Sequence, residues 1–351
     1  MTVYIGVDFH PYHQTVAFCN SAEGIISCQT LRHKELETVR QFYSQFQPPV
    51  VVGLEACGKA RWFESVVAEL GCQLLIGDPN RIRQRARSRH KSDSRDAELI
   101  LDLLIKDEFP ALWRRSPQSQ TVLEQLRLRH ALVQQRTACC NHLQALARLA
   151  GLPRGKLLTK PGRQRVLAAS LTDTERQECQ VWWQLADHLS EQIQALNQWL
   201  GAHAATDRSV QRLKTHPGIG DLTALCIVHT LGEVSRFSSA AKVVAYAGLD
   251  PVEHSSGERR AYGSISKAGS RVLRFLLGQA ALRSLPADQQ LRQFYEQVRG
   301  RRGHGKAKVA AARKLLVRCY IMLRDEITYT EFVRRGASKL ACPAIAVGAR
   351  R

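Results

Sequence analysis

Residues 3–8 read Val3-Tyr-Ile-Gly-Val-Asp8, a short apolar run that ends in an acid. Such a run, rich in β-branched residues, predicts a buried β-strand. Two further strands are predicted over Gln14–Asn20 and Gly24–Leu31, joined by a hairpin turn at residues 21–24. A second buried strand is predicted over Pro49–Glu55, and it also ends in an acid. These strands decide the fold class of the N-terminal third.

Helices are predicted between and after these strands. Apolar residues recur at helical spacing over Lys34–Phe46 and Arg61–Leu70, and another strand is predicted over Cys72–Gly77. Ala97–Ile105 predicts the last helix of this region. Three strands, helix, strand, helix, strand, helix is the order of a ribonuclease-H-like α/β fold. We therefore expect such a domain over residues 1–110.

Four acids stand at the ends of these elements. Asp8 and Glu55 end two buried strands, and Asp93 and Asp96 open the last helix. If the two strands are parallel neighbours, Asp8 and Glu55 emerge at the same carboxyl edge of the sheet. The i, i+3 spacing of Asp93 and Asp96 puts their Cβ atoms about 5–6 Å apart on one helical face. Because hard cations take oxygen ligands, the four carboxylates predict a site for Mg²⁺, with Mn²⁺ as an alternative.

An ordinary structural role competes with this interpretation. An acid at a strand end is commonly just solvated, and acids in a first helical turn suit the helix dipole. However, the strip just upstream has a basic residue at every odd position from Arg81 to Lys91. RNA, DNA and simple solvation all fit this strip. Its position beside the acids favours metal-dependent chemistry on nucleic acid, in which two ions about 3.5–4 Å apart stabilise the attacking and leaving oxygens.

The composition supports a polyanionic partner. The chain carries 51 basic and 31 acidic residues, a net charge of +20, and its 44% hydrophobic content is typical of a globular protein. No apolar run approaches the roughly 20 residues of a membrane span, and the N-terminus lacks a signal-peptide pattern. We expect a cytoplasmic protein without a membrane partner. The ten cysteines include no C-x-x-C pair, which indicates reduced apolar residues and not zinc ligands.

Residues 111–205 predict a different architecture. From Ser116 to about Leu200 the sequence changes character. Apolar residues recur at three- and four-residue steps over Leu123–Leu149, which predicts a long amphipathic helix. Gly151–Gly155 breaks this helix, and Lys160-Pro-Gly162 is interpreted as the start of a second break. Thr172–Leu200 predicts a second long helix. The two helices form a hairpin that either bundles within the chain or pairs between subunits as a coiled coil.

Residues 206–330 are expected to form a mainly helical domain, followed by a tail at 331–351. His216-Pro-Gly-Ile-Gly220 predicts a tight turn that opens a helix, similar to the hairpin of helix-hairpin-helix DNA binders, whose backbone N–H groups hold a phosphate. From Arg259 to Arg324 the chain has sixteen Lys or Arg and two acids, which indicates a phosphate-binding face. Just before it, the hydroxyls of Ser255-Ser-Gly257 suit phosphate binding or nucleophilic attack, or an ordinary surface turn.

Three stretches of the N-terminal third resemble those of a known family. They are Gly6-Val-Asp-Phe-His10, Gly53-Leu-Glu-Ala-Cys-Gly58 and Lys91-Ser-Asp-x-x-Asp-Ala97. Together they resemble the D-E-D-D motif of RuvC-like domains in IS110 family transposases. The resemblance implies that Asp8, Glu55, Asp93 and Asp96 are catalytic metal ligands.

The C-terminal third resembles the transposase domain of the same family. The motifs P-x-x-x-S-S-G, starting at Pro251, and I-S-K-x-G, starting at Ile265, occur in the family's order. The resemblance implies a nucleophilic serine, which Ser256 matches best, with Ser255 as the rival. Ser266 and Lys267 match the I-S-K element and are assigned to contact with the nucleic-acid backbone.

The resemblance covers most of residues 3–285 and implies a recombinase that excises and integrates an insertion sequence. In this family a structured bridge RNA pairs with target and donor DNA, so base pairing would choose the sites. Carboxylates from one subunit and the serine from another would form a composite site in a dimer or tetramer. The rivals are a RuvC-like metal-dependent nuclease, such as a junction resolvase, and a non-enzymatic nucleic-acid-binding protein. A bacterial protein that acts at the nucleoid is expected.

Overall fold

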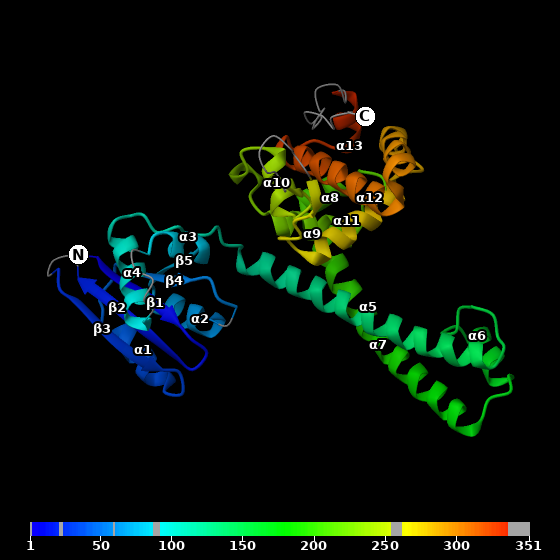
Figure 1. Ribbon diagram of the computed structural model, residues 1–351, viewed down its shortest axis with the longest axis horizontal. Helices are drawn as coiled ribbons and strands as arrows, with labels where there is room; N and C mark the ends of the chain where they lie inside the picture. The colour runs from blue at the N-terminus through cyan, green and yellow to red at the C-terminus, as the bar shows by residue number, and fades with distance from the viewer. Residues whose placement is uncertain (1, 21–23, 59, 87–91, 254–261, 336–351) are drawn as a thin grey trace. The chain divides into compact units, whose positions relative to one another are not determined.

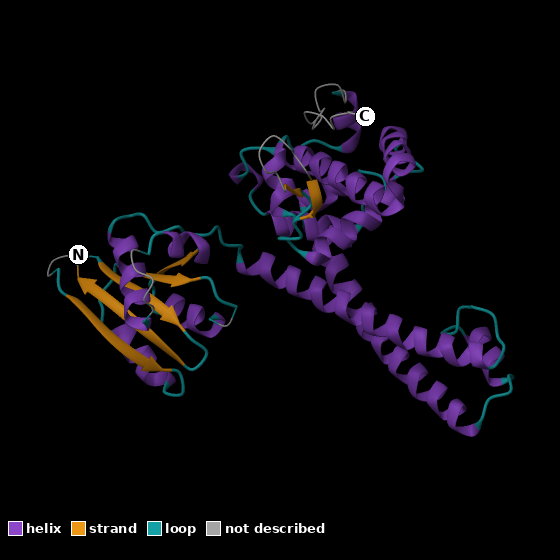
Figure 2. Cartoon of the chain, in the orientation of Figure 1, coloured by secondary structure: helices purple, strands orange, loops and turns teal. Residues whose placement is uncertain are grey.

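The computed structural model describes residues 2–20, 24–58, 60–86, 92–253 and 262–335, and these divide into two compact units (Figure 1). The first unit is Met1–Arg114 and the second is Arg115–Arg351. The first contains a five-stranded sheet with helices, and the second is almost entirely helical (Figure 2). The expected mixed α/β N-terminal domain and mainly helical remainder are therefore confirmed.

The sheet of the first unit has the strand order β3-β2-β1-β4-β5. The hairpin strands β2 and β3 are antiparallel to their neighbours, whereas β1, β4 and β5 are parallel. In the register of β1 and β4, Val7 lies opposite Leu54, so the acids that follow them emerge side by side at one edge. The strands are β1 (Val3–Phe9), β2 (His13–Asn20), β3 (Ile26–Arg32), β4 (Val50–Glu55) and β5 (Gln73–Gly77).

Helices cover both faces of this sheet (Figure 1). Because side chains alternate along a strand, Ile5 and Val52 pack into a core with α1 (Leu36–Ser44) and α2 (Arg61–Glu69). On the other face, Tyr4 and Val51 pack against α4 (Asp93–Ile105) and α3 (Pro79–Gln84). Residues 6, 8, 53 and 55 share this second face, so the two strand acids lie on the side of α4.

Two glycines let α4 lie close to the sheet. A Cβ atom at Gly6 would meet the carbonyl oxygen of Ala97 at 2.3 Å and the nitrogen of Leu101 at 2.5 Å. A Cβ atom at Gly53 would meet side-chain atoms of α4 instead, Leu104 Cδ1 at 2.8 Å and Ile100 Cγ2 at 3.0 Å. Each glycine stands two residues before a strand acid. In both strands the G-x-acid pattern thus lets α4 pack against the glycine and leaves the acid at the end of the strand.

The second unit begins with a helical hairpin. α5 (Pro117–Leu149) packs along α7 (Asp173–Thr206), and the intervening segment carries a short helix, α6 (Lys160–Leu167) (Figure 1). The sequence interpretation of residues 160–162 as a second break is therefore wrong. Proline is accepted in a first helical turn, and Thr159 caps this one. The hairpin bundles within the chain, with Cys139 and Leu143 of α5 buried near α7.

The remaining helices form one core with the near ends of α5 and α7. Helix α13 packs into this core through Phe332, so the expected tail does not begin at residue 331; residues 336–351 lie outside the described part. A two-stranded ribbon was not expected, because its strands are too short to show a period. These elements are α8 (Arg208–Lys214), α9 (Asp221–Leu231), α10 (Ala240–Tyr246), β6 (Pro251–Glu253), β7 (Tyr262–Ile265), α11 (Arg271–Ser284), α12 (Gln289–Arg324) and α13 (Tyr329–Arg334).

Two bulk expectations can be compared with the structure. In the part of the chain that is described, no helix combines the length and apolarity of a membrane span. The nine described cysteines are all free thiols, and five of them are buried, as small apolar residues are.

We expect Gly6→Ala to destabilise the first unit by about 1–3 kcal/mol, the usual cost of overpacking, because the added Cβ meets helix backbone. Gly53→Ala should cost less, since a flexible leucine end moves aside. Hydrogen exchange of the β1 and α4 peptides measures this directly. Gly58→Ala is the matched control, because nothing lies within 4 Å of a Cβ there. Equal exchange in the Gly6→Ala and Gly58→Ala variants would contradict the proposed fit.

Candidate active site

The predicted carboxylates are held by three elements of the first unit. Asp8 is the penultimate residue of β1, Glu55 ends β4, and Asp93 and Asp96 lie in the first turn of α4. Ser92 caps this helix by accepting a hydrogen bond from the backbone N–H of Arg95. Cap and glycines together fix where the helix begins relative to the sheet edge.

The side chain of Asp8 is 17% exposed, which is less than Glu55 at 31% or Asp93 at 51%. Burial raises the pKa of the Asp8 carboxyl; His10 opposes this through its charge and a hydrogen bond, and the negative charges of Asp96 and Asp93 raise the pKa further. The three carboxylates therefore lie within electrostatic reach of one another. A bound cation would relieve this repulsion.

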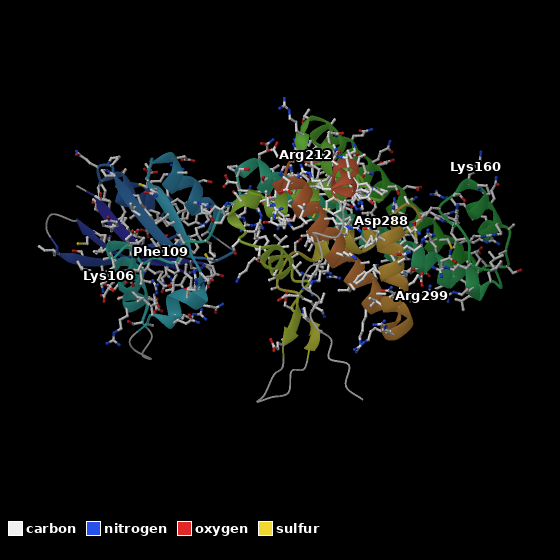
Figure 3. All side chains as sticks on the ribbon, turned by 90° about the horizontal axis from the view of Figure 1, so that it is seen from above. Lys106, Phe109, Lys160, Arg212, Asp288 and Arg299 are labelled. Atoms are coloured by element: carbon white, nitrogen blue, oxygen red, sulfur yellow. The ribbon has the colours of Figure 1, made fainter. Side chains whose placement is uncertain are left out.

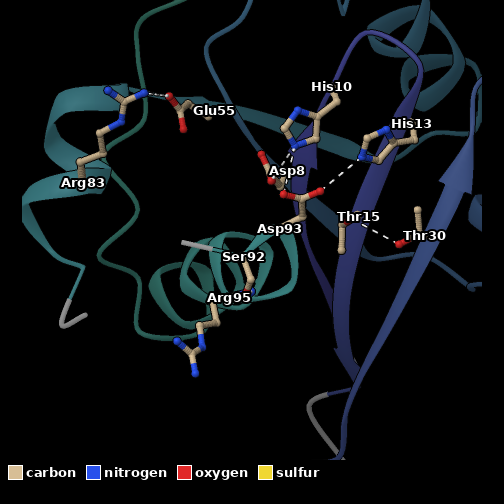
Figure 4. A network of polar contacts seen from close by, with 10 residues as sticks. All are labelled: Asp8, His10, His13, Thr15, Thr30, Glu55, Arg83, Ser92, Asp93 and Arg95. Carbon is tan, nitrogen blue, oxygen red and sulfur yellow. Dashed lines mark hydrogen bonds and ion pairs between the residues drawn. The ribbon is translucent and has the colours of Figure 1, made fainter. Parts of the chain in front are cut away.

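Two histidines complete this corner of the site (Figure 4). His10 Nε2 lies 3.0 Å from Asp8 Oδ2 and 3.6 Å from Asp93 Oδ1. His13 Nε2 lies 3.3 Å from Asp93 Oδ2. Asp93 is thus joined to both sides of the β1–β2 turn, which orients the first residue of α4 toward the strand acid.

Glu55 is held differently, by an arginine of the basic strip. Arg83 on α3 places Nη2 3.4 Å from Glu55 Oε1 (Figure 4). Arg85 donates to the backbone carbonyl of Glu108 and also pairs with its carboxylate at 3.6 Å. Two of the strip's arginines therefore have acidic partners within the unit, a role that was not among the sequence interpretations. Residues 87–91 of the strip lie outside the described part.

The donor set of this corner fits a divalent cation. Carboxylate oxygens of Asp8 and Asp93 and two imidazole nitrogens converge here, and Asp96 is half-buried nearby on α4. Oxygen ligands suit hard cations such as Mg²⁺, and imidazole nitrogen suits borderline ions. Asp8, Asp93 and Asp96 are thus near one another, whereas Glu55 on the neighbouring strand is paired with Arg83. Metal binding by Asp8, Glu55, Asp93 and Asp96 stays a prediction.

The predicted nucleophile belongs to the second unit. Ser255 and Ser256 lie outside the described residues, between strands β6 and β7, which pair in antiparallel fashion. Figure 3 shows these two strands side by side, standing out from the helices of their unit. The I-S-K element begins at Ile265, the last residue of β7. Ser266 donates its hydroxyl to Asp250 Oδ1 at 2.5 Å, so that hydroxyl serves an internal bond, while Lys267 adopts a positive φ of 56°.

A basic hollow lies beside this element. It has a volume of about 390 Å³ and includes Lys267, Arg271, Arg274 and Lys308, with no acid among its described lining residues. Arg274 also donates to the carbonyls of Gly269 and Ala247, which fixes the turn before α11. Phe275, 45% exposed, lies in the same wall. Cations around an exposed aromatic ring suit the phosphates and bases of nucleic acid.

A second hollow, of about 580 Å³, shares Arg271 with the first. Arg115 and Arg127 line it together with the backbone of Gly269 and Ser270 at the start of α11. Arg271 therefore stands between two concave basic surfaces. The sequence indicated a basic face over residues 259–324, but it did not reveal these hollows or the contribution of α5.

The His216–Gly220 turn opens α9, as predicted, but it is packed tightly into the core. Gly218 has a φ of +87°, and a Cβ there would meet Ser284 Oγ at 2.5 Å. Burial lowers the pKa of His216 to about 4, so this imidazole is neutral at physiological pH. The glycine thus has a packing role, and phosphate binding by this turn stays a prediction.

His10 and His13 are the site residues that sequence reasoning missed. His10 follows Asp8 by two positions, the spacing that puts side chains on one face of a strand. That signal was present in the sequence. The position of His13 depends on the turn, in which the N–H of His10 donates to the carbonyl of His13 at 2.9 Å.

Comparison with known families gives two matches in chain order. The DEDD transposase profile of the IS110 group, described as "Transposase", matches residues 5–150. A profile described as "Transposase IS116/IS110/IS902 family" matches residues 210–296. The two matches include the four carboxylates in the first and the β6–β7 region in the second.

Individual proteins are similar over most of the chain. The chain is 31% identical to a "Probable family 20 transposase" of Pseudomonas aeruginosa, over 68% of this chain and 72% of that protein. It is 28% identical to the transposase for insertion sequence element IS1111A of Coxiella burnetii, over 79% of each. It is also 28% identical to the pilin gene-inverting protein of Moraxella bovis, over 72% of this chain and 73% of that one.

We expect Arg271→Ala to weaken binding of duplex DNA and to reduce the salt slope of binding by about 1, because one phosphate contact is lost. Fluorescence anisotropy at several KCl concentrations measures both quantities. Arg292→Ala, an equal change of charge at an exposed residue outside both hollows, is the control. If both variants lose the same affinity, the hollows have no special part in binding.

Proposed function

Because this chain belongs to the IS110/IS116/IS902 family of transposases, we propose that it is the site-specific recombinase of an insertion sequence, which excises and integrates the element. The observation that carries the proposal is the convergence of Asp8, Asp93 and Asp96 where α4 meets the edge of the sheet. The strand order 3-2-1-4-5, in which β2 alone runs antiparallel to the other four strands, supports a ribonuclease-H-like fold for this unit.

DNA rearrangement is also what one relative's name describes. The Moraxella bovis protein is called a pilin gene-inverting protein, and inversion requires cutting and rejoining at two sites. For the present chain we infer the same class of reaction, phosphoryl transfer with rejoining. Simple hydrolysis, as in a junction resolvase, needs only the carboxylates and would not conserve the phosphodiester bond.

The proposed nucleophile is Ser256, with Ser255 as the alternative. The serine Oγ forms a bond to the scissile phosphorus while one P–O bond to deoxyribose breaks, and the released sugar hydroxyl takes up a proton. Attack by a hydroxyl of another strand reverses these steps, so the DNA is rejoined and the serine is released. The basic hollow at Lys267 supports this assignment, because it lies beside the end of β7, one of the two strands between which the serines stand in the sequence.

We assign the carboxylates to holding Mg²⁺, or Mn²⁺ in its place. A divalent ion bound there would supply Lewis-acid stabilisation of negative charge on the reacting phosphate. Asp8 and Glu55 project from adjacent parallel strands, and Asp93 and Asp96 come from one turn of α4. Arg83 must release Glu55 before that carboxylate can bind a cation. Because the side chain of Arg83 is 64% exposed, its ion pair with Glu55 is weak enough to exchange.

Guidance by a structured bridge RNA that pairs with donor and target DNA is the proposed source of site choice. The net charge of +20 and the basic hollows support binding of nucleic-acid backbone, which carries no sequence information by itself. Sequence would then be read by base pairing, as in other RNA-guided systems.

A dimer or tetramer is proposed, with carboxylates and serine supplied by different subunits. The two sets lie in different compact units of the chain. On the helical hairpin, Val181 and Leu185 are 55% and 42% exposed and stand one turn apart on α7. This exposed apolar pair supports pairing of hairpins between subunits.

Ser256→Ala is expected to abolish the covalent protein–DNA adduct and, with it, strand cleavage, because no other group replaces the serine oxygen. Denaturing gels of labelled donor DNA measure both. Ser255→Ala is the matched control and should form the adduct. Continued recombination by Ser256→Ala would make the serine assignment wrong, and cutting without an adduct would favour the nuclease.

Asp96→Asn is expected to reduce the rate of strand cleavage in Mg²⁺ by more than about 100-fold. Loss of a residue that only supports a metal ligand typically costs about 10–100-fold, and loss of a ligand should cost more. Asp102→Asn is the control, because Asp102 lies on the same helix and pairs with Lys106 at 2.7 Å. Retention of wild-type cleavage by Asp96→Asn would refute the metal site.

A further inference from the structure

The turn between β1 and β2 brings two imidazole rings together beside α4. His10 and His13 stack with ring centroids 4.8 Å apart and an interplanar angle of 23°. The backbone bond from His10 N–H to His13 O, at 2.9 Å, closes the turn. Both Nε2 atoms are directed at carboxylates, as Figure 4 shows.

These atoms have the separations of ligands around one ion. One ligand atom from each of His10, His13 and Asp93 lies within 4.8 Å of the other two. The shortest distances from Asp93 are 3.6 Å from Oδ1 to His10 Nε2 and 3.3 Å from Oδ2 to His13 Nε2. Ligands that each stand about 2.0–2.2 Å from an ion are about 3–4 Å apart when they occupy adjacent positions. Both histidine side chains are 38% exposed and Asp93 is 51% exposed, so an ion has access.

The chemistry of the donors sets the class of ion. Two imidazole nitrogens with one carboxylate form a mixed N/O set that favours borderline first-row ions, whereas Mg²⁺ prefers oxygen alone. The ordinary alternative is a pair of His–Asp hydrogen bonds that fasten the turn to α4. Such bonds join His10 Nε2 to Asp8 at 3.0 Å and His13 Nε2 to Asp93 at 3.3 Å. They do not require that His10 Nε2 also lies 3.6 Å from Asp93, which brings both rings to one carboxylate.

We propose that His10, His13 and Asp93 bind one divalent transition ion, of the series from Mn²⁺ to Zn²⁺, in preference to Mg²⁺. This inference rests on the proposed function only in that Asp93 is also assigned to the four-carboxylate site. Asp93 offers one oxygen to each histidine, so it joins the two sets of ligands. The ion lies next to Asp8, at the edge where phosphoryl transfer is proposed.

Titration of the full chain with Co²⁺, followed by its visible absorption and by calorimetry, tests the proposal. A Cys28→Ser/Cys57→Ser background removes the two exposed thiols among the described residues. On that background, His13→Gln should lower Co²⁺ affinity by about tenfold or more, in line with the cost of disturbing metal ligation. The affinity of this variant for Mg²⁺ should fall by less than its affinity for Co²⁺, because His13 contacts Asp93 but is not one of the four carboxylates. His188→Gln, at an exposed histidine of α7, is the control.

Imidazole-¹⁵N labelling of unmutated protein gives an answer that does not depend on how a variant folds. Zn²⁺ should shift the Nε2 signals of two of the twelve histidines, at one equivalent. Wild-type Co²⁺ affinity in His13→Gln, or Zn²⁺ titration without such paired shifts, would overturn the proposal. Asp96→Asn separates it from the proposed function: loss of Mg²⁺-dependent cleavage with intact Co²⁺ binding supports two sets of ligands. Loss of Co²⁺ binding in Asp96→Asn would overturn the three-residue site.

Discussion

The close approach of α4 to β1 is the contact on which the candidate active site depends. Gly6 lets the backbone of Ala97 and Leu101 come within a distance that no side chain would permit. The helix then begins beside the end of the strand, and its first-turn acids reach Asp8. Without this approach the acids would be ordinary solvated residues on separate elements. Backbone packing therefore brings the acids together, and their charges interact because of that packing.

Alternation along the strands explains why the two G-x-acid motifs work together. A glycine two residues before an acid lies on the same face of the sheet as that acid. The glycine therefore lets α4 approach the strand on the face where the acid meets the N-terminus of the helix. Because β4 pairs in parallel with β1, its glycine and acid lie beside those of β1, at the same edge of the sheet. At Gly53 the helix touches with side chains, and at Gly6 it touches with backbone. The first strand therefore constrains the helix more strictly than the second.

Much of this architecture is readable from the sequence, because it follows from local period and end residues. The strands of the first unit, the first-turn acids and the long hairpin helices were predicted in this way. What the sequence did not provide depends on tertiary contacts. Arg83 meets Glu55 across 28 positions, and the His13 ring is placed by a turn and not by a period. Strands of three and four residues, as in β6 and β7, are too short for any pattern to emerge.

The charges of the site also follow a physical order. Asp8 is the more enclosed carboxylate, and the negative charges of Asp93 and Asp96 act on it. Asp93 and Glu55 are more exposed, and they are paired with imidazole rings and with Arg83, respectively. Exposed pairs of this kind contribute little to stability, generally about 0–1 kcal/mol. They therefore orient these carboxylates without holding them tightly. The proposed cation at Glu55 would exchange with Arg83 at small cost, whereas the imidazole rings beside Asp93 could remain in place.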